Sequence, residues 1–239
     1  VINLEEKEKM KKIVTGLLAA MLLAGCGSTA NSGTTTTQTS EPEVKEDAVE
    51  VVAKKELPAP VDTTLTYKPS EDAAETQCTE DAYVSGCAAI NNTNLREYLN
   101  RDDVLYIDLR DYSDYAKKHL RNFECIPYFA LIYAKEADEN TVQLYSGDLT
   151  NPTATYEESD ELLEAFFPKD QTIFLMCQSG GRVAQLMKIL AAKGYDMSRI
   201  YNITGMGQYS DGNYLDLTED TAEVTVEATY SFEGLTRAK

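Results

Sequence analysis

A cysteine, two glycines and an arginine occur within six consecutive positions of the chain, in the run CQSGGR at 177–182. Gly180 and Gly181 permit the left-handed backbone that turns successive amides toward one point, and converging amides bind anions. A helix that begins at about Arg182 would add unpaired N–H groups and the positive end of its dipole. These groups and the Arg182 guanidinium would stabilise the thiolate of Cys177, so the pattern predicts a nucleophilic cysteine in an anion-binding loop.

The same loop would stabilise a persulfide on Cys177. Sulfur transfer uses such a group, because a thiolate attacks a sulfur donor, stores the outer sulfur and delivers it to an acceptor. This cycle requires no metal and no organic cofactor, and a chain with one histidine and scattered cysteines offers no zinc-ligand set. The alternative is that Cys177 is a buried thiol at a strand end, followed by an ordinary turn. The predicted anion-binding loop consists of Gln178, Ser179, Gly180, Gly181 and Arg182.

Short apolar runs alternate with amphipathic segments around this loop. This alternation favours an α/β fold, with a doubly wound parallel sheet that helices cover on both faces. The ligand sites of such sheets lie beyond the carboxyl ends of the strands, and Cys177 stands at such an end. The strands are predicted at 104–109, 172–177 and 199–203, and the helices at 93–100, 113–120, 158–167 and 183–192, the last of which ends at Gly194.

Four segments resemble motifs of the rhodanese-type sulfurtransferases, and they occur in that family's order. The resemblance covers about residues 90–212, which we interpret as a rhodanese-like domain. It implies a rhodanese-like fold and a persulfide-forming Cys177. YIDLRD (106–111) is similar to the family's strand that ends in Asp-x-Arg, and HLRNFECIP (119–127) is similar to its segment His-Ile-x-Gly-Ala-x-Asn-Ile-Pro. CQSGGR (177–182) is similar to the six-residue active-site loop. GMGQY (205–209) is similar to the closing Gly-Gly-x-x-Trp turn.

The family motifs also imply roles for residues outside the loop. Asp108, Arg110 and His119 would be structural. The chain departs from the family pattern at several positions, and these departures weaken the structural motif more than the catalytic one. Lys118 replaces the usual Gly before the histidine, Asn122 and Phe123 replace Gly-Ala, and Tyr209 replaces Trp.

The length of the loop bears on the substrate. The related dual-specificity phosphatases and arsenate reductases have five residues between Cys and Arg and hold a tetrahedral oxyanion, whereas four residues separate Cys177 from Arg182 here. The resemblance therefore favours sulfur over phosphate chemistry, with a small donor anion such as thiosulfate or polysulfide and a thiol, a cyanide-like or a protein acceptor. A rhodanese-like module that only binds a partner or senses redox state is the alternative.

The segment from Tyr128 to Asp170 is longer than this family usually needs between its motifs. Its 43 residues include the run QLYSGDLTNPTATY. Long connections near an active site commonly serve as lids or recognition loops, so we predict such a role here.

The region before the domain has the features of an exported protein. From Met10 the chain has two lysines, a mostly apolar stretch at 13–24 and small residues up to Cys26. These features predict a signal peptide at 1–25, whose apolar stretch is shorter than the ~20 residues that span a bilayer. Residues 1–9 precede a better start at Met10, and we interpret them as an over-extended start.

The run LAGC at 23–26 resembles the bacterial lipobox. This resemblance implies that Cys26 is lipidated, for example with palmitate, and that the mature protein is anchored by its lipid at the extracytoplasmic face of the cell membrane. A plain signal peptide with an incidental Cys26 is the alternative.

Two further segments flank the predicted domain. Residues 26–62 change from Gly, Ser and Thr to Glu, Lys and Pro, a composition that predicts a disordered, flexible linker after the lipidated cysteine. Residues 63–89 form an N-terminal extension and 213–239 a C-terminal one. Within the latter, AEVTVEATYSF (222–232) predicts an added edge strand or an accessory hairpin.

The remaining cysteines and the charge limit the partners. Cys78 and Cys87 stand nine apart and, in an exported protein, either pair as a disulfide or remain two free or buried thiols. We interpret Cys125 as a core thiol rather than a resolving cysteine. Forty acidic residues against 22 basic ones give a net charge of −18, which repels phosphate groups and argues against nucleic acid as a partner.

Overall fold

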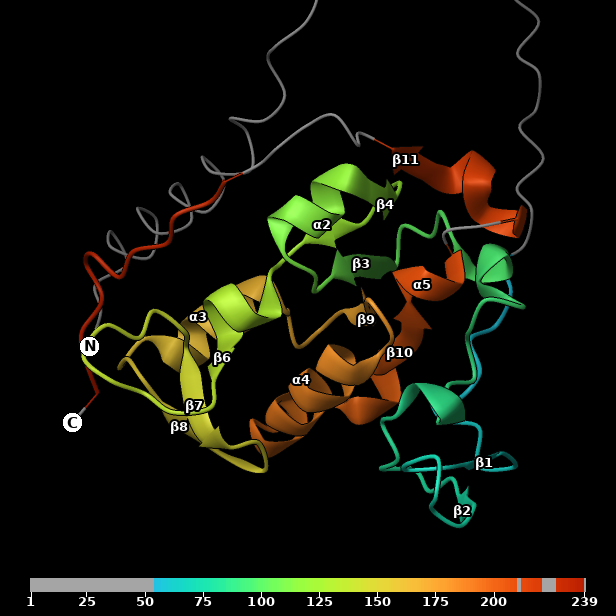
Figure 1. The fold of residues 1–239 in the computed structure, drawn as a ribbon, viewed down its shortest axis with the longest axis horizontal. Helices are drawn as coiled ribbons and strands as arrows, with labels where there is room; N and C mark the ends of the chain where they lie inside the picture. Colours follow the sequence, from blue (N-terminus) through green and yellow to red (C-terminus); the bar gives the residue numbers. More distant parts are fainter. Residues whose placement is uncertain (1–53, 210–211, 221–226, 239) are drawn as a thin grey trace, which may run out of the picture. The chain divides into compact units, whose positions relative to one another are not determined.

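A four-stranded parallel sheet forms the centre of the computed structural model, which describes residues 54–209, 212–220 and 227–238 (Figure 1). The predicted signal peptide, Cys26 and the linker up to residue 53 lie outside the described residues. All described residues belong to one compact unit, 51–239, and none of their helices is long and apolar enough to cross a membrane. The strand order is β10-β9-β3-β5, with β3 at Val104–Asp108, β5 at Glu124–Cys125, β9 at Thr172–Cys177 and β10 at Ile200–Gly205.

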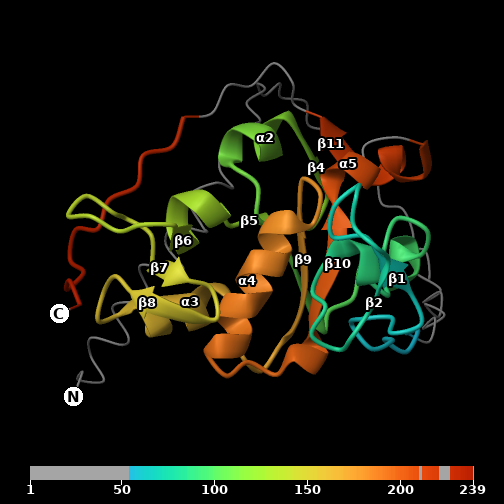
Figure 2. The same cartoon turned by 60° about the horizontal axis from the view of Figure 1, so that its bottom comes forward.

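Both faces of this sheet are buried, which explains why its strands are continuous apolar runs. Side chains alternate between the faces of a strand, so Ile173, Leu175 and Cys177 pack on one side and Phe174 and Met176 on the other. α4 (Gly181–Ala192) lies along β9 and β10 on the side of Cys177 (Figure 2), and α3 (Ser159–Phe166) joins the same core. The 3₁₀ turn η2 (Leu95–Tyr98) and the short α5 (Met206–Tyr209) cover the other face. The predicted α/β fold, with helices on both faces of a parallel sheet, is confirmed.

Two predicted helices are shorter than expected. The segment 93–100 forms only the turn η2, and the segment 113–120 divides into α2 (Tyr112–Lys117) and a strand, β4 (Lys118–Leu120). β4 pairs antiparallel with β11 (Thr218–Asp220), a partner about 100 residues away in sequence, which overrides the local helical pattern. β11 lies before the segment 222–232, for which an edge strand or hairpin was predicted. Residues 221–226 lie outside the described residues, and 227–232 form no strand.

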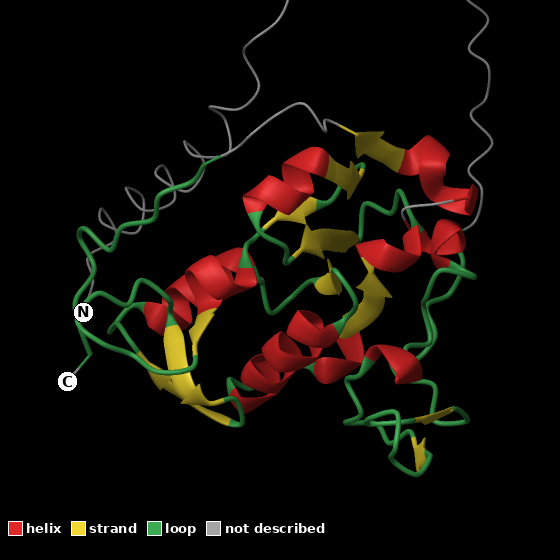
Figure 3. Cartoon of the chain, in the orientation of Figure 1, coloured by secondary structure: helices red, strands yellow, loops and turns green. Residues whose placement is uncertain are grey.

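The long segment 128–170 forms a small subdomain beside the central sheet (Figure 3). It begins with a π-helical turn, η3 (Tyr128–Ile132), and ends with α3. Between them β6 (Tyr133–Ala134), β7 (Tyr145–Asp148) and β8 (Asn151–Ala154) form a three-stranded sheet. Near the end of the described chain, Arg237 stacks on Tyr156 at 4.9 Å and forms a β-bridge with it, so the C-terminal segment holds this subdomain.

The N-terminal extension is mostly loop. It contains β1 (Thr66–Tyr67), β2 (Thr76–Gln77) and the 3₁₀ turn η1 (Ser85–Cys87), and a disulfide joins Cys78 to Cys87 with Cα atoms 5.7 Å apart. The linker prediction was wrong for residues 54–62, which lie on the domain. The Tyr201 hydroxyl donates to the Pro58 carbonyl at 2.7 Å, and Leu57 packs on the core. The prediction failed here because the apolar and proline residues at the end of this segment find partners on the domain.

Candidate active site

Cys177 lies at the carboxyl end of β9, and its side chain faces the core beside α4. It is 1% exposed. The Gly180 amide donates a hydrogen bond to its Sγ atom at 3.2 Å, and α4 begins at the next residue. A backbone N–H and the start of a helix therefore both favour negative charge on this sulfur.

The two glycines of the loop differ in their conformation. Gly180 has φ +86°, as expected, and a Cβ atom there would lie 2.6 Å from the Ser85 Cβ. The expectation that Gly181 is also left-handed was wrong. Gly181 is the first residue of α4, without a positive φ, and a Cβ there would meet nothing within 4 Å. One left-handed residue is enough to turn the chain from β9 into α4, because the first turn of the helix orients the amides that follow.

The segment 205–209 packs directly on the loop, which gives this motif a physical role. The Gly207 amide donates to the Gln178 carbonyl at 3.1 Å. A Cβ atom on Gly205 would lie 2.3 Å from the Gln178 carbonyl carbon, so only glycine fits there. The substituted Tyr209 is fully buried below it, and its hydroxyl accepts from Thr204 Oγ1 at 3.1 Å and donates to the Ile203 carbonyl.

The Arg182 guanidinium contacts groups that follow β3 and a ring of η3. It donates to the Leu109 carbonyl at 3.3 Å, lies 3.7 Å from a carboxylate oxygen of Asp111 and stacks on the Phe129 ring at 5.5 Å. These groups belong to the end of β3 and to η3, and the contacts of Arg182 within the described residues include none with Cys177. These contacts engage the guanidinium near the end of β3, and its predicted role in stabilising the thiolate stays a prediction.

Asp108 and Arg110 form a buried ion pair that shapes the chain after β3. Arg110 Nη2 lies 2.7 Å from Asp108 Oδ2 and also donates to the Lys118 carbonyl at 2.7 Å. Burial raises the pKa of the Asp108 carboxyl, and the Arg110 guanidinium opposes this rise. The pair ties the end of β3 to the end of α2, which is a structural role.

His119 contacts groups outside the loop. Its ring stacks on Tyr115 with centroids 4.0 Å apart, and its Nδ1 lies 2.9 Å from the Tyr115 carbonyl oxygen. Its Nε2 is 3.8 Å from a carboxylate oxygen of Glu219 in β11. The contacts of His119 thus join α2, β4 and β11.

Asn202 is a site residue that the sequence reasoning missed. It is 4% exposed in β10 and makes three hydrogen bonds: its Nδ2 donates to the Tyr83 carbonyl at 2.7 Å and to the Gly180 carbonyl at 3.2 Å, and its Oδ1 accepts from the Thr204 amide at 2.9 Å. The only sequence signal was a polar amide within the apolar run RIYNI. A buried amide of this kind needs partners, which its neighbours in sequence do not reveal.

Cys125, at the end of β5, is a half-buried free thiol. Its Sγ donates to the Arg110 carbonyl at 3.4 Å, and burial is the main cause that raises the pKa of the thiol. Because β3 lies between β5 and β9, two strand spacings of about 10 Å in total separate this position from the end of β9. Cys125 is thus a packed thiol at the same edge of the sheet.

Within the described part of the chain, no three His, Cys, Asp or Glu residues are placed to hold a metal ion.

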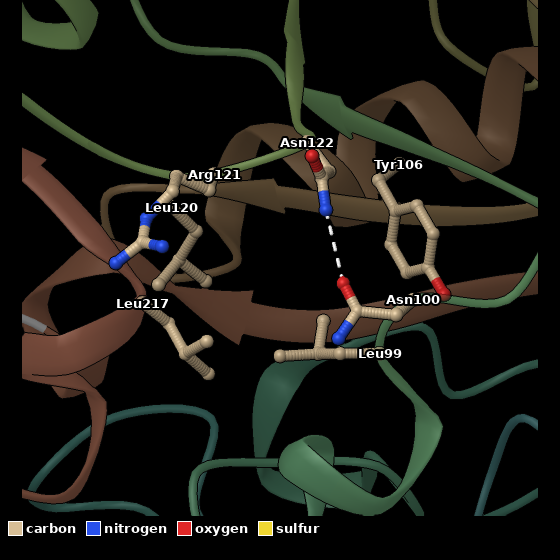
Figure 4. Close-up of a pocket in the computed structure, with 7 residues that line it drawn as sticks. All are labelled: Leu99, Asn100, Tyr106, Leu120, Arg121, Asn122 and Leu217. Carbon is tan, nitrogen blue, oxygen red and sulfur yellow. Dashed lines mark hydrogen bonds between the residues drawn. The ribbon is translucent and has the colours of Figure 1, made fainter. Parts of the chain in front are cut away.

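Figure 4 shows a separate pocket. Its residues Tyr106 and Leu120 belong to the core cluster on the face of the sheet opposite Cys177. In this pocket Asn122 Nδ2 donates to Asn100 Oδ1 at 3.0 Å. None of its lining residues belongs to the loop 177–182, so it is not the site of the cysteine. The lining residues are Leu99, Asn100, Tyr106, Leu120, Arg121, Asn122 and Leu217.

Comparison with known proteins finds similarity to rhodanese-like domains. Residues 91–206 match the family model of the rhodanese-like domain. The solution NMR structure of the rhodanese-like domain of a protein from Anabaena sp. is 13% identical to the chain, with a TM-score of 0.33, and the match covers 62% of this chain and 88% of that one. No curated protein sequence matches the chain.

Proposed function

We propose that this protein is a sulfurtransferase that moves a sulfane sulfur through a persulfide on Cys177, since residues 91–206 match the family model of the rhodanese-like domain. The observation that carries the proposal is the hydrogen bond from the Gly180 amide to Cys177 Sγ, at the carboxyl end of β9 and the start of α4. Rhodanese-like domains also occur without catalysis, so the chemistry of this thiol is the point to test.

The reaction has two displacement steps at sulfur. The Cys177 thiolate attacks the outer sulfur of a donor such as thiosulfate or a polysulfide, the S–S bond of the donor breaks, and sulfite or a shortened polysulfide leaves with the electron pair. The anionic Cys177 persulfide that forms is stabilised by the Gly180 amide and the start of α4. A thiolate or cyanide then attacks the outer sulfur and takes it, and the Cys177 thiolate returns.

The burial of Cys177 limits which donors reach it. The thiol is 1% exposed, while Gln178 and Ser179 beside it are exposed. A small donor needs only a local opening of these two residues. A bulky donor would require the whole loop to move, so we propose small sulfur anions as donors.

The test is sulfur transfer by the purified protein. Wild type incubated with thiosulfate or polysulfide should convert cyanide to thiocyanate, and mass analysis should show one added sulfur atom on the peptide with Cys177. Cys177→Ser should lose both signals, whereas Cys125→Ser should keep them. A folded wild type that gains no sulfur from either donor would contradict the proposal.

A binding or redox-sensing module is the second candidate. The ion pair of Arg182 with Asp111, at 3.7 Å, supports it, because an engaged guanidinium gives less help to an incoming anion. This candidate predicts no turnover, together with a partner protein retained through the subdomain 128–170. Deleting β7 and β8 should then release the partner.

We also propose that Cys26 is lipidated and tethers the protein at the extracytoplasmic face of the membrane. The run LAGC at 23–26, preceded by two lysines and an apolar stretch, supports the proposal. Cys26→Ala should move the protein from the membrane fraction to the soluble one. Unchanged retention on the membrane would contradict a lipid anchor at this residue.

A further inference from the structure

Three segments far apart in sequence meet at Gly180, the residue whose amide contacts the thiol. From β10, Asn202 Nδ2 donates to the Gly180 carbonyl at 3.2 Å. From the N-terminal extension, Ser85 lies so close that a Cβ on Gly180 would be 2.6 Å from its Cβ. Gly180 itself links Cys177 to α4. The position of its amide therefore depends on residues outside the loop.

Asn202 connects the other two segments. With the same Nδ2 atom it donates to the Tyr83 carbonyl of the N-terminal extension at 2.7 Å and to Gly180. Its Oδ1 accepts from the Thr204 amide at 2.9 Å, and Thr204 has the unusual φ of +76°. The carboxamide is thus fixed at one end, and its Nδ2 joins the Tyr83 carbonyl to the Gly180 carbonyl, which also accepts from the Ala184 amide at 3.0 Å.

The Cys78–Cys87 disulfide determines where Tyr83 and Ser85 lie. Both residues belong to the ten-residue segment that this bond closes, which we name the disulfide-closed segment (residues 78–87). Both cysteines are buried, at 2% and 0% exposure, and the Cys87 carbonyl accepts from the Asp62 amide at 2.8 Å. Without the bond, most of this loop would lack a regular hydrogen-bonded structure to keep it against Gly180.

We propose that Asn202 is a positioning residue for the active site, and that it acts together with the disulfide-closed segment to hold Gly180 in place. The Gly180 amide can donate to Cys177 only from this position, so sulfur transfer depends on the Asn202 carboxamide and on an intact Cys78–Cys87 bond. The expected loss of sulfur transfer rests on the proposed function, whereas the position of Gly180 concerns the loop alone.

The first experiment compares Asn202→Asp with Asn202→Ala. Asp keeps the acceptor for the Thr204 amide but places a carboxylate oxygen against two carbonyls, and its protonation at lower pH restores one donor. We expect the rate of Cys177 persulfide formation to fall at least tenfold at pH 8 in both variants. Relative to wild type at each pH, Asn202→Asp should recover part of this loss toward pH 5, and Asn202→Ala should not.

The second experiment removes the disulfide without adding a reductant, which would also reduce the persulfide. In the Cys78→Ser/Cys87→Ser double variant we expect hydrogen exchange of the amides at 178–182 and alkylation of Cys177 by iodoacetamide to speed up at least fivefold. Leu163→Ala, a core variant in α3, controls for lower stability and should change neither rate at temperatures where all variants are folded.

The outcomes separate this inference from the proposed function. If wild type transfers no sulfur but the double variant still shows faster exchange at 178–182, the positioning holds and the sulfurtransferase proposal fails. If wild type is active and the double variant matches it in exchange, alkylation and transfer, the disulfide-closed segment has no positioning role. Equal pH profiles for Asn202→Asp and Asn202→Ala would contradict the part assigned to the carboxamide.

Discussion

At the scale of single residues, the geometry of the site depends on positions where glycine has no Cβ atom. Gly205 and Gly180 bring backbone or side chains closer than any Cβ would allow, whereas Gly181 has open space around its Cα. The sequence alone does not distinguish these three glycines. Only the neighbours of each one, which come from distant segments, reveal where glycine is required.

Gly205→Ala should therefore be far more damaging than Gly181→Ala. The new methyl at 205 would lie 2.3 Å from the Gln178 carbonyl carbon, so the loop must shift, at a cost of about 1–3 kcal/mol and more than tenfold in the transfer rate. Gly181→Ala removes backbone freedom from the unfolded chain at a helical position and should stabilise the protein by about 0.4–1 kcal/mol. Urea unfolding of both variants measures the difference, and equal stabilities would contradict the packing described at Gly205.

The sequence predicted the position of the loop 177–182 correctly, at the end of β9 and the start of α4, because these contacts are local. It did not reveal the partners of Arg182 and Asn202, because these partners are distant in sequence. Asp111, Leu109 and Phe129, which surround Arg182, lie more than 50 residues before it, and Tyr83 lies more than 100 before Asn202. Side-chain partners at such separations leave no periodic pattern that a reader of one sequence can use.

At the scale of elements, long-range pairing decides the structures that local propensity predicted wrongly. The run KHL looked like the last turn of a helix, but it forms β4 because β11 supplies its hydrogen-bonding partner. The three strands and the two longer helices were predicted nearly correctly, since continuous apolar runs and a regular helical stripe reflect burial on the sheet. The positions of the helix ends and the strand pairings required the tertiary structure.

The contact between η1 and the loop can be measured as a coupling between two substitutions. Gly180→Ala introduces a methyl against Ser85 and strains a residue at φ +86°. Ser85→Gly removes the opposing Cβ, so the double variant should be more stable than the sum of the single effects predicts, by about 1 kcal/mol. Additive effects in a thermal or urea double-mutant cycle would show that η1 does not press on the loop.

An ion pair joins the subdomain 128–170 to the end of α4. Lys193 Nζ lies 2.8 Å from Asp160 Oδ1, and the Tyr145 hydroxyl donates to the same oxygen at 2.6 Å. Burial raises the pKa of the Asp160 carboxyl, but Lys193 and Tyr145 lower it by more, so the pKa lies below its ordinary value of 3.8. The negative charge of Asp160 therefore stabilises the folded state above this pH.

Asp160→Asn should cost about 0.5–1 kcal/mol of unfolding free energy at pH 7, a small value because the carboxylate is mostly exposed. A lowered pKa in the folded state means that the contribution is complete above the pKa of the unfolded chain and is lost as the pH falls through the folded value. The gap between wild type and variant should thus shrink below about pH 4. Urea unfolding at a series of pH values measures the gap, and one that stays constant to pH 3 would rule out an ionic origin.

At the scale of the whole molecule, the folded unit is larger than the part that matches the family model. The match spans 91–206, but residues 54–62 and 78–87 pack on the sheet and the loop, and the C-terminal segment packs on Tyr156. The sequence predicted the core of the fold from its motifs. It placed the edges of the folded unit poorly, because loops without regular patterns reveal nothing about what they contact.

The disulfide should matter for the stability of this larger unit. Closing a ten-residue loop restricts the unfolded chain, so the Cys78→Ser/Cys87→Ser variant should lose about 2–3 kcal/mol of unfolding free energy. Cys125→Ser, which removes a thiol outside any disulfide, serves as the control. Equal stability of the double variant and wild type would show that the packing of Cys78 and Cys87 alone holds the segment.

The bond between Tyr201 and Pro58 has a consequence for how this protein can be divided. A fragment cut at the family boundaries would begin after Pro58, Tyr83 and Ser85, and would leave the hydroxyl of Tyr201 and the amide of Asn202 facing solvent in place of their carbonyl partners. Gene fusions and expression plasmids that keep only residues 91–206 would thus separate Cys177 from part of its own support. The smallest transferable module of this chain begins no later than residue 54.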